Sequence, residues 1–287
     1  MKLVTWNTQW CCGLDGRVSA ARIVDGARAL AGEGGFDVLC LQEIAQGYAD
    51  MPGAPGDQPA EIEALLPGYQ VFFGAAVDEF NAQGQRQRFG NLIATRLPVA
   101  LVEHHRLPWP ADAGIRSMPR MCSVVTVRDP ALGALRVMTT HLEYYSKPQR
   151  MAQTLALRDL HAEACARAAA PPLDDDSRSP FQTKTHTPQA VLCGDFNLEA
   201  SEPEYSALQR PLAATGAAHS LTDAWQIAHA GRPHEATFRL FDRSYGPEPI
   251  CCDFIFVSSS LAPHVRAMRI DGATQVSDHQ PVLIRLD

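Results

Sequence analysis

Short apolar runs rich in β-branched residues recur along the whole chain, and turn-forming residues (Gly, Pro, Asp or Asn) bound them. Runs of this kind are typical of β-strands separated by turns. A chain of 287 residues is also long enough to bury a sizeable core without disulfides. The runs predict ten strands, over 2–6, 38–41, 69–73, 92–95, 100–105, 122–128, 135–140, 191–193, 252–257 and 282–285.

Helices are expected between some of these strands. Apolar residues at helical spacing predict them over 17–32, 61–66, 148–169 and 202–210. Strand–helix alternation, combined with a strand-only stretch over 69–140, indicates a mixed α/β protein. No change of composition marks a domain boundary, so we expect a single domain over 1–287. Two segments, one rich in Pro and Gly and one containing three consecutive Asp residues, are expected to be loop insertions near 47–60 and 171–189.

The charge balance limits the class of partner. The chain has 25 basic and 32 acidic residues, a net charge of −7, and very few lysines. Such a chain lacks the basic stripe of a protein that binds long polyanions regardless of sequence. It remains compatible with an enzyme acting on phosphates, whose carboxylates hold a metal. Because no apolar run reaches the roughly 18–20 residues that span a bilayer and the start lacks a secretory signal, we expect a cytoplasmic protein. Nothing indicates a partner protein.

Polar residues follow or flank six of the apolar runs, at the positions where function collects in α/β folds. A single Asn or Asp at a strand end is usually a turn former. A set made only of carboxylates, amides and two histidines is less easily explained by turns. Oxygen ligands without thiolates suit a hard cation such as Mg²⁺ or Mn²⁺. The residues concerned are Asn7, Glu43, His141, Asp195, Asn197, Asp253, Asp278 and His279.

These residues lie in an ordered series of motifs that resembles the endonuclease/exonuclease/phosphatase superfamily, which includes deoxyribonuclease I. The likeness runs from Asn7 to His279, nearly the whole chain. It implies an α/β four-layer sandwich, with two mixed β-sheets packed face to face, helices on the outside and a cleft at one edge. The motifs are Trp6-Asn7, Leu41-Gln42-Glu43, Thr140-His141-Leu142, Gly194-Asp195-Phe196-Asn197, Asp253-Phe254-Ile255-Phe256 and Ser277-Asp278-His279.

The resemblance also implies a metal site. Glu43 and Asp278 are the expected ligands of Mg²⁺ or Mn²⁺. Asn7 is expected next to them, reaching the metal directly or through water. Phosphoester hydrolysis needs the charge on the phosphate to be neutralised, and such a cation does this.

The catalytic groups are assigned in the same way. Asp195 and Asn197 are two residues apart, so an extended backbone places both on one face, where they orient the attacking water and hold a phosphate oxygen. By resemblance, Asp253 pairs with His279 and fixes its tautomer, and His141 donates to the phosphate. Either Asp195 or the Asp253–His279 pair is the general base. We favour Asp195 holding the water while His279 touches the phosphate.

Three further residues are candidates for substrate binding, each with a plainer alternative. Asn91 faces the phosphate or is a turn residue. Arg120 contacts a substrate phosphate through its fork of donors or forms a surface ion pair. Tyr144 stacks on a base or sugar, or packs within its loop.

The sequence therefore predicts a metal-dependent phosphoesterase, most simply a hydrolase of phosphodiester bonds in nucleic acid or in small molecules. One alternative is a phosphomonoesterase acting on inositol phosphates, and another is a catalytically silent binding module on the same fold. The acidic charge favours small phosphodiesters over long duplexes. The feature that would reverse this expectation is a cluster at the entrance formed by Arg86, Arg88, Arg116 and Arg120.

Overall fold

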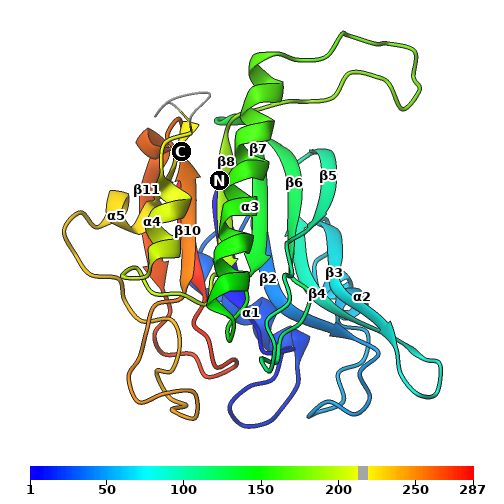
Figure 1. Cartoon of the computed structure of the whole chain (residues 1–287), viewed down its shortest axis with the longest axis vertical. Helices are drawn as coiled ribbons and strands as arrows, with labels where there is room; N and C mark the ends of the chain where they lie inside the picture. Colours follow the sequence, from blue (N-terminus) through cyan, green and yellow to red (C-terminus); the bar gives the residue numbers. More distant parts are fainter. Residues whose placement is uncertain (213–218) are drawn as a thin grey trace.

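The computed structural model describes residues 1–212 and 219–287, and within them the strands form two six-stranded sheets (Figure 1). Both sheets are mixed: β1 runs parallel to β2, and β7 parallel to β8, while the other neighbouring strands are antiparallel. In spatial order the first sheet contains β11 (Val265–Ile270), β12 (Val282–Leu286), β1 (Lys2–Asn7), β2 (Val38–Gln46), β4 (Arg86–Thr95) and β3 (Gln70–Phe80). The second contains β5 (Val99–Arg106), β6 (Met121–Asp129), β7 (Gly133–His141), β8 (Ala190–Asp195), β10 (Asp253–Ser258) and β9 (Leu221–Asp223).

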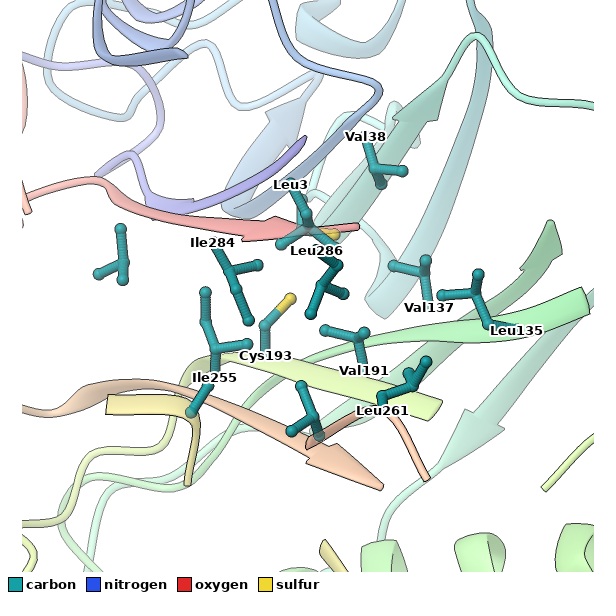
Figure 2. Close-up of a cluster of buried hydrophobic side chains, with 14 of the residues drawn as sticks. Leu3, Val38, Leu135, Val137, Val191, Cys193, Ile255, Leu261, Ile284 and Leu286 are labelled. Carbon is teal, nitrogen blue, oxygen red and sulfur yellow. The ribbon is translucent and has the colours of Figure 1, made fainter. Parts of the chain in front are cut away.

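The two sheets pack face to face over a shared apolar core (Figure 2). Leu3 and Ile284 point into this core from the first sheet, and Val191 and Cys193 from the second. Their neighbour Leu192 points the other way, because successive side chains of a strand alternate between its faces. The second sheet is therefore apolar on both faces and needs cover on its outer side.

Helices supply that cover and complete four layers. On the first sheet α1 (Ala20–Ala31) packs through Ile23 and Val24, and α2 (Gln58–Leu65) lies beside it. On the second sheet the long helix α3 (Lys147–Ala169) packs through Leu157, next to α4 (Pro203–Gln209). The predicted fold class, two mixed sheets in an α/β sandwich, is confirmed.

The helix boundaries follow ordinary capping chemistry. The Ser19 hydroxyl accepts a hydrogen bond from the Arg22 N–H at the start of α1, and Ser146 accepts one from Gln149 at the start of α3. Gly32 ends α1 with φ of 67°, a conformation that glycine adopts without strain. Because Ser19 is the N-cap, the first helix begins at Ala20, three residues later than the predicted start at 17.

Some elements are absent from the sequence prediction. β9, β11, the short helix α5 (Ala224–Ala228) and the 3-10 turn η2 (Ala262–His264) are present in the structure. Most strands are longer than predicted; β3 and β4, for example, continue into an exposed polar hairpin ending at Phe80 and Arg86. No helix or strand lies within 171–189, and this segment projects beyond the end of α3 (Figure 1). The segment 47–60 is a loop up to its last residues, which begin α2. Among the described residues, no helix combines the length and hydropathy needed to cross a membrane.

Candidate active site

Strand register brings the predicted polar residues to one end of the sandwich. In the second sheet Asp195 lies directly opposite His141 on one side and Asp253 on the other. In the first sheet Asn7 pairs with Gln42, the residue before Glu43. Residues that are in register on neighbouring strands share a face, so their side chains converge over the edge where the two sheets meet.

A cavity of about 270 Å³ opens at this edge. Eight of the predicted residues line it: Glu43, Arg120, His141, Tyr144, Asp195, Asn197, Asp278 and His279. Its other walls are Gln9, Trp10, Phe89, Met118, Tyr145, Phe238 and Tyr245. Polar groups thus occupy the floor of the cavity, and aromatic rings form much of its rim.

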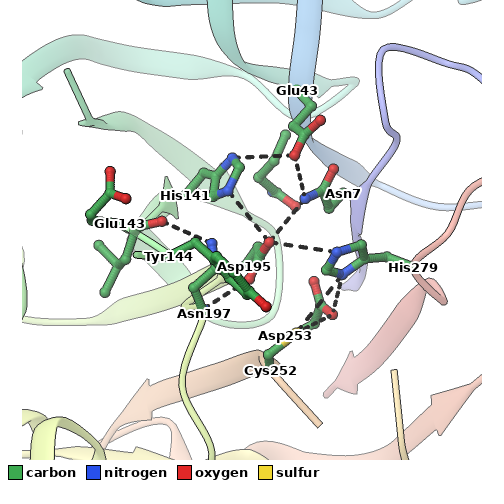
Figure 3. Close-up of polar contacts among 12 residues, drawn as sticks. Asn7, Glu43, His141, Glu143, Tyr144, Asp195, Asn197, Cys252, Asp253 and His279 are labelled. Carbon is green, nitrogen blue, oxygen red and sulfur yellow. Dashed lines mark hydrogen bonds and ion pairs between the residues drawn. The ribbon is translucent and has the colours of Figure 1, made fainter. Parts of the chain in front are cut away.

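Asp195 is the hub of the polar floor (Figure 3). Its Oδ2 accepts a hydrogen bond from Asn7 Nδ2 at 2.9 Å and lies 3.5 Å from His141 Nε2 and 3.8 Å from His279 Nε2. Its Oδ1 accepts from the backbone N–H of Asn197 at 2.9 Å. Burial raises the pKa of Asp195 to about 6, and the negative charge of Asp253 adds to the rise while His279 opposes it.

Asn197 differs from expectation in its backbone. Strand β8 ends at Asp195, and Asn197 has φ of 52°, so the chain is not extended between them. Both residues nevertheless line the cavity, because the turn is held by the Asn197 Nδ2 bond to the Leu142 carbonyl at 2.9 Å. The predicted shared face is thus produced by a turn and not by strand alternation.

A break in the pairing of β2 with β4 turns the Glu43 side chain toward the cavity. The pairing of β2 with β4 shifts between Leu41 and Ile44, and Glu43 has φ of 60°. Its Oε1 accepts from Asn7 Nδ2 at 3.1 Å and lies 4.0 Å from His141 Nδ1. Burial raises the pKa of Glu43 to about 7, and the charge of Asp278 contributes.

Asn7 presents nitrogen, not oxygen, to these carboxylates. Its Nδ2 bonds to both Glu43 and Asp195, while its Oδ1 accepts from the backbone N–H of Gln9 at 3.1 Å. In this orientation Asn7 aligns two carboxylates and offers no oxygen to a cation. Its predicted direct ligation would need the amide to turn over.

Asp253 lies behind His279, away from the cavity. Asp253 Oδ2 is 2.9 Å from His279 Nδ1, so the expected pair is present and His279 Nε2 faces Asp195. Burial by itself lowers the pKa of His279, but the carboxylates of Asp253 and Asp195 outweigh it and raise the pKa to about 10. Burial and the neighbouring Arg120 charge lower the pKa of His141 well below its usual value. The surroundings of the two floor histidines therefore shift their pKa values in opposite directions.

Arg120 is buried and paired, not part of a basic entrance. Its Nε lies 3.3 Å from Oε2 of Glu143, whose side chain is fully buried, and its Nη1 has no partner among the described residues. The three other arginines of the proposed cluster have separate partners: Arg86 pairs with Asp78, Arg88 lies over Phe73 and Arg116 lies over Tyr145. Of the four, Arg120 lines the cavity and Arg116 lies over the rim residue Tyr145, whereas Arg86 and Arg88 are held by partners on β3.

The remaining two predicted substrate residues differ in position. Tyr144 lines the cavity and packs edge-on against Tyr145 and Tyr245. Asn91 lies deeper, with its Nδ2 3.3 Å from the Met121 carbonyl, in a small side cavity that also touches Arg120 and His141. Its contact with substrate stays a prediction.

Sequence reasoning missed several residues of the site. Glu143 had a signal, since it lies two residues past His141 at the end of a predicted strand. Phe238 and Tyr245, and Thr237, whose hydroxyl donates to Asp253, had none, because they belong to an irregular segment between α5 and β10. Neither loop insertion supplies a cavity-lining residue, although the Pro52 carbonyl accepts a hydrogen bond from Trp10 Nε1.

The donor set fits a hard divalent cation. Glu43 and Asp278 both line the cavity and both have raised pKa values through burial, so their negative charge is incompletely compensated by the protein. Carboxylate oxygens are the ligands that Mg²⁺ and Mn²⁺ prefer. Cys252 also lies close to Asp195 and His279, but burial raises the pKa of its thiol well above 9.0, so it is a poor ligand.

Comparison with known proteins agrees with this geometry. The sequence matches the model of the endonuclease/exonuclease/phosphatase family over residues 4–279. No protein of curated function matches significantly.

Solved structures share the fold. An endonuclease/exonuclease/phosphatase protein from Beutenbergia cavernae is 24% identical, with a TM-score of 0.70 over 100% of this chain and 71% of that one. A Bacteroides thetaiotaomicron protein described as a mannosyl-6-phosphatase is 18% identical, with a TM-score of 0.66 over 100% and 99%. Truncated TDP2 from Caenorhabditis elegans is 16% identical, with a TM-score of 0.60 over 99% and 96%.

Members of this family are in general phosphoester hydrolases, and they typically use divalent metal ions. With a match that extends from the first strand to the last polar motif, the chain belongs to the endonuclease/exonuclease/phosphatase family.

Proposed function

We propose that this protein is a metal-dependent hydrolase of phosphodiester bonds. The observation that carries the proposal is the convergence of Asn7, His141 and His279 on one oxygen of Asp195, beside the carboxylates of Glu43 and Asp278. Glu43 and Asp278 would hold Mg²⁺ or Mn²⁺. When bound, the ion neutralises charge on the phosphate and so lowers the barrier to attack.

The chain's own groups supply the remaining chemistry. Asp195 holds the attacking water and takes its proton as the new P–O bond forms and the bond to the leaving oxygen breaks. His279 and His141 donate N–H groups to the phosphate oxygens as negative charge develops there. Asp253 keeps the His279 Nδ1 proton on the side away from the cavity, which leaves Nε2 to face the substrate. Asn197 borders the water site.

Arg120 supplies a further contact to the phosphate. A buried guanidinium with a free Nη1 beside the cavity is a strong donor for an anionic oxygen. Glu143 offsets the cost of burying that charge. The Tyr144 ring then contacts the organic part of the substrate at the rim. Asn91 contacts the phosphate from the deeper side of the cavity.

The substrate we favour is small. Ligand cavities are usually about 300–1,000 Å³, and this one lies just below that range. Among the described residues that line it, Arg120 is the one arginine or lysine, which suits a substrate with a single phosphate. The phosphomonoesterase alternative draws support from the similarity to a protein described as a mannosyl-6-phosphatase. The aromatic rim favours a diester, because a second ester group gives those rings something to contact.

Turnover assays with Mg²⁺ or Mn²⁺ test the proposal. The panel includes bis-p-nitrophenyl phosphate, p-nitrophenyl phosphate, plasmid DNA, single-stranded DNA, RNA, sphingomyelin and inositol phosphates. We expect hydrolysis of the small diester to exceed that of the monoester, and EDTA to abolish it. Preferred hydrolysis of a monoester would favour the phosphomonoesterase. No turnover of any member would favour a silent binding module.

A further inference from the structure

Thr237 holds the carboxylate that orients His279. Its hydroxyl donates to Asp253 Oδ2 at 2.6 Å, and the same oxygen lies 2.9 Å from His279 Nδ1. The backbone N–H groups of Cys252 and Asp253 donate to the Thr237 hydroxyl oxygen at 3.2 Å each. Thr237 is completely buried, and the other carboxylate oxygen, Oδ1, has no partner among the described residues. Apart from His279, the Thr237 hydroxyl is therefore the shortest contact that fixes the rotation of the Asp253 carboxylate, since the Cys252 thiol lies 3.6 Å from the same oxygen.

Phe238, the residue after Thr237, packs against the imidazole ring of His279. The ring of Phe238 stacks on that of His279, with centroids 4.3 Å apart and an angle of 18° between the planes. The Thr237 carbonyl accepts from the Gln280 N–H at 2.7 Å, and Phe238 bonds through its backbone to Ile250 on its other side. Two consecutive residues thus hold both members of the Asp253–His279 pair.

The segment that carries these residues is anchored outside the cavity. His234 Nε2 lies 2.5 Å from Asp223 Oδ2, and the Tyr205 hydroxyl donates to that oxygen at 2.6 Å. Asp223 is fully buried on β9, where it pairs with Phe256 of β10, the strand that Asp253 begins. The anchor and the carboxylate are therefore fixed to the same strand.

We propose that Thr237 is a positioning residue for hydrolysis, acting through Asp253 on His279, and that the His234–Asp223 contact holds its segment in place. This inference rests on the proposed function. A hydroxyl that shares the carboxylate oxygen with an imidazole fixes the carboxylate and, through it, the direction of the ring, as outer partners of catalytic histidines do. No contact between Thr237 and the substrate is needed.

Three variants test the inference kinetically. Thr237→Val keeps the shape and removes the hydroxyl, and Thr237→Ser restores the hydroxyl. Thr187→Val is the matched control, since the Thr187 hydroxyl donates to the Ala134 carbonyl and accepts from the Gln189 N–H at the opposite end of β7 from His141. We expect Thr237→Val to lower kcat by about 10- to 100-fold with KM little changed, while Thr237→Ser and the control stay close to wild type. Wild-type kcat in Thr237→Val, or an equal loss in the control, would overturn the inference.

A second measurement needs no substrate. In nuclear magnetic resonance spectra the Nδ1 proton of His279, assigned by its loss in His279→Ala, reports its hydrogen bond to Asp253. We expect this resonance to move or exchange away in Thr237→Val, to return in Thr237→Ser and to move partially in His234→Gln. An unchanged resonance in folded Thr237→Val would refute the positioning role. If instead the resonance responds while wild type hydrolyses no phosphoester, the proposed function fails and the contact stands as structural.

Discussion

The buried side chain of His161 on α3 makes the free energy of unfolding depend on pH. Arg136 Nη2 lies 2.6 Å from His161 Nδ1, and His161 Nε2 lies 2.6 Å from the His219 carbonyl. The guanidinium donates to Nδ1 and the ring donates from Nε2, so the neutral tautomer satisfies both contacts. The ring is fully buried. Protonation would place a second positive charge beside the buried Arg136.

Burial, reinforced by the Arg136 charge, lowers the pKa of His161 from 6.5 to about 4. The unfolded chain therefore binds a proton between these values that the folded protein does not. Stability is fully present above pH 6.5 and is lost as the pH falls toward 4. The difference corresponds to about 3 kcal/mol of unfolding free energy.

The perturbation is His161→Gln, a neutral side chain with one acceptor for Arg136 and one donor for the His219 carbonyl. Urea unfolding of wild type and variant at several pH values from 7 to 4 gives the free energy of each. We expect wild type to lose about 3 kcal/mol more than the variant over this interval, because all other titrating groups are common to both. Parallel curves would refute the assignment of a neutral buried imidazole.

Three further outcomes are expected. Glu43→Ala should weaken Mn²⁺ binding by at least about tenfold in calorimetric titration, and equal affinity would contradict its role as a ligand. Glu143→Gln leaves Arg120 buried without its counter-charge, so urea unfolding should show a loss of about 3–5 kcal/mol, and no loss would contradict the buried pair. Gly194→Ala should lower both the melting temperature and activity, because φ is 137° and a Cβ would lie 2.0 Å from the Thr140 carbonyl oxygen, between the strands that carry His141 and Asp195; a wild-type melting temperature would contradict this.

Much of the fold follows from local pattern. The central strands were predictable because both faces of each are apolar, as in β8, where Leu192 and Val191 face different cores. β9 has three residues, and β11 lies at a sheet edge with the exposed Arg266 and Arg269 interrupting its apolar residues, so neither has a strong apolar run. A short or mixed strand at a sheet edge forms because a neighbouring strand pairs with it, and that information is not local.

The site was predictable where a polar residue ends or flanks a buried strand. His141, Asp195 and Asp253 meet because their strands are neighbours in register. The direction of a single side chain was less accessible, as the left-handed backbone at Glu43 and Asn197 illustrates.

Residues brought in by loops could not be found from periodicity. Phe238 reaches the site through isolated bridges to Ile250 and His279, which leave no pattern in the chain. Proximity in sequence did not predict where the arginine side chains lie. Arg86 bonds to Asp78 across a hairpin, whereas Arg120 is buried and paired with Glu143. Side-chain pairing, not spacing, decides where those charges lie.

The most direct test of the central claim is the rate of bis-p-nitrophenyl phosphate hydrolysis with Mn²⁺ by wild type and by His279→Ala, with the folded fraction of each measured in parallel. Nε2 of His279 faces Asp195 across the cavity floor. A group that stabilises the transition state or transfers a proton contributes roughly 10²- to 10⁴-fold in rate. We predict a loss in this range in a variant that remains folded. Comparable rates for the two proteins would contradict the assignment of this cavity as the site of phosphoester hydrolysis.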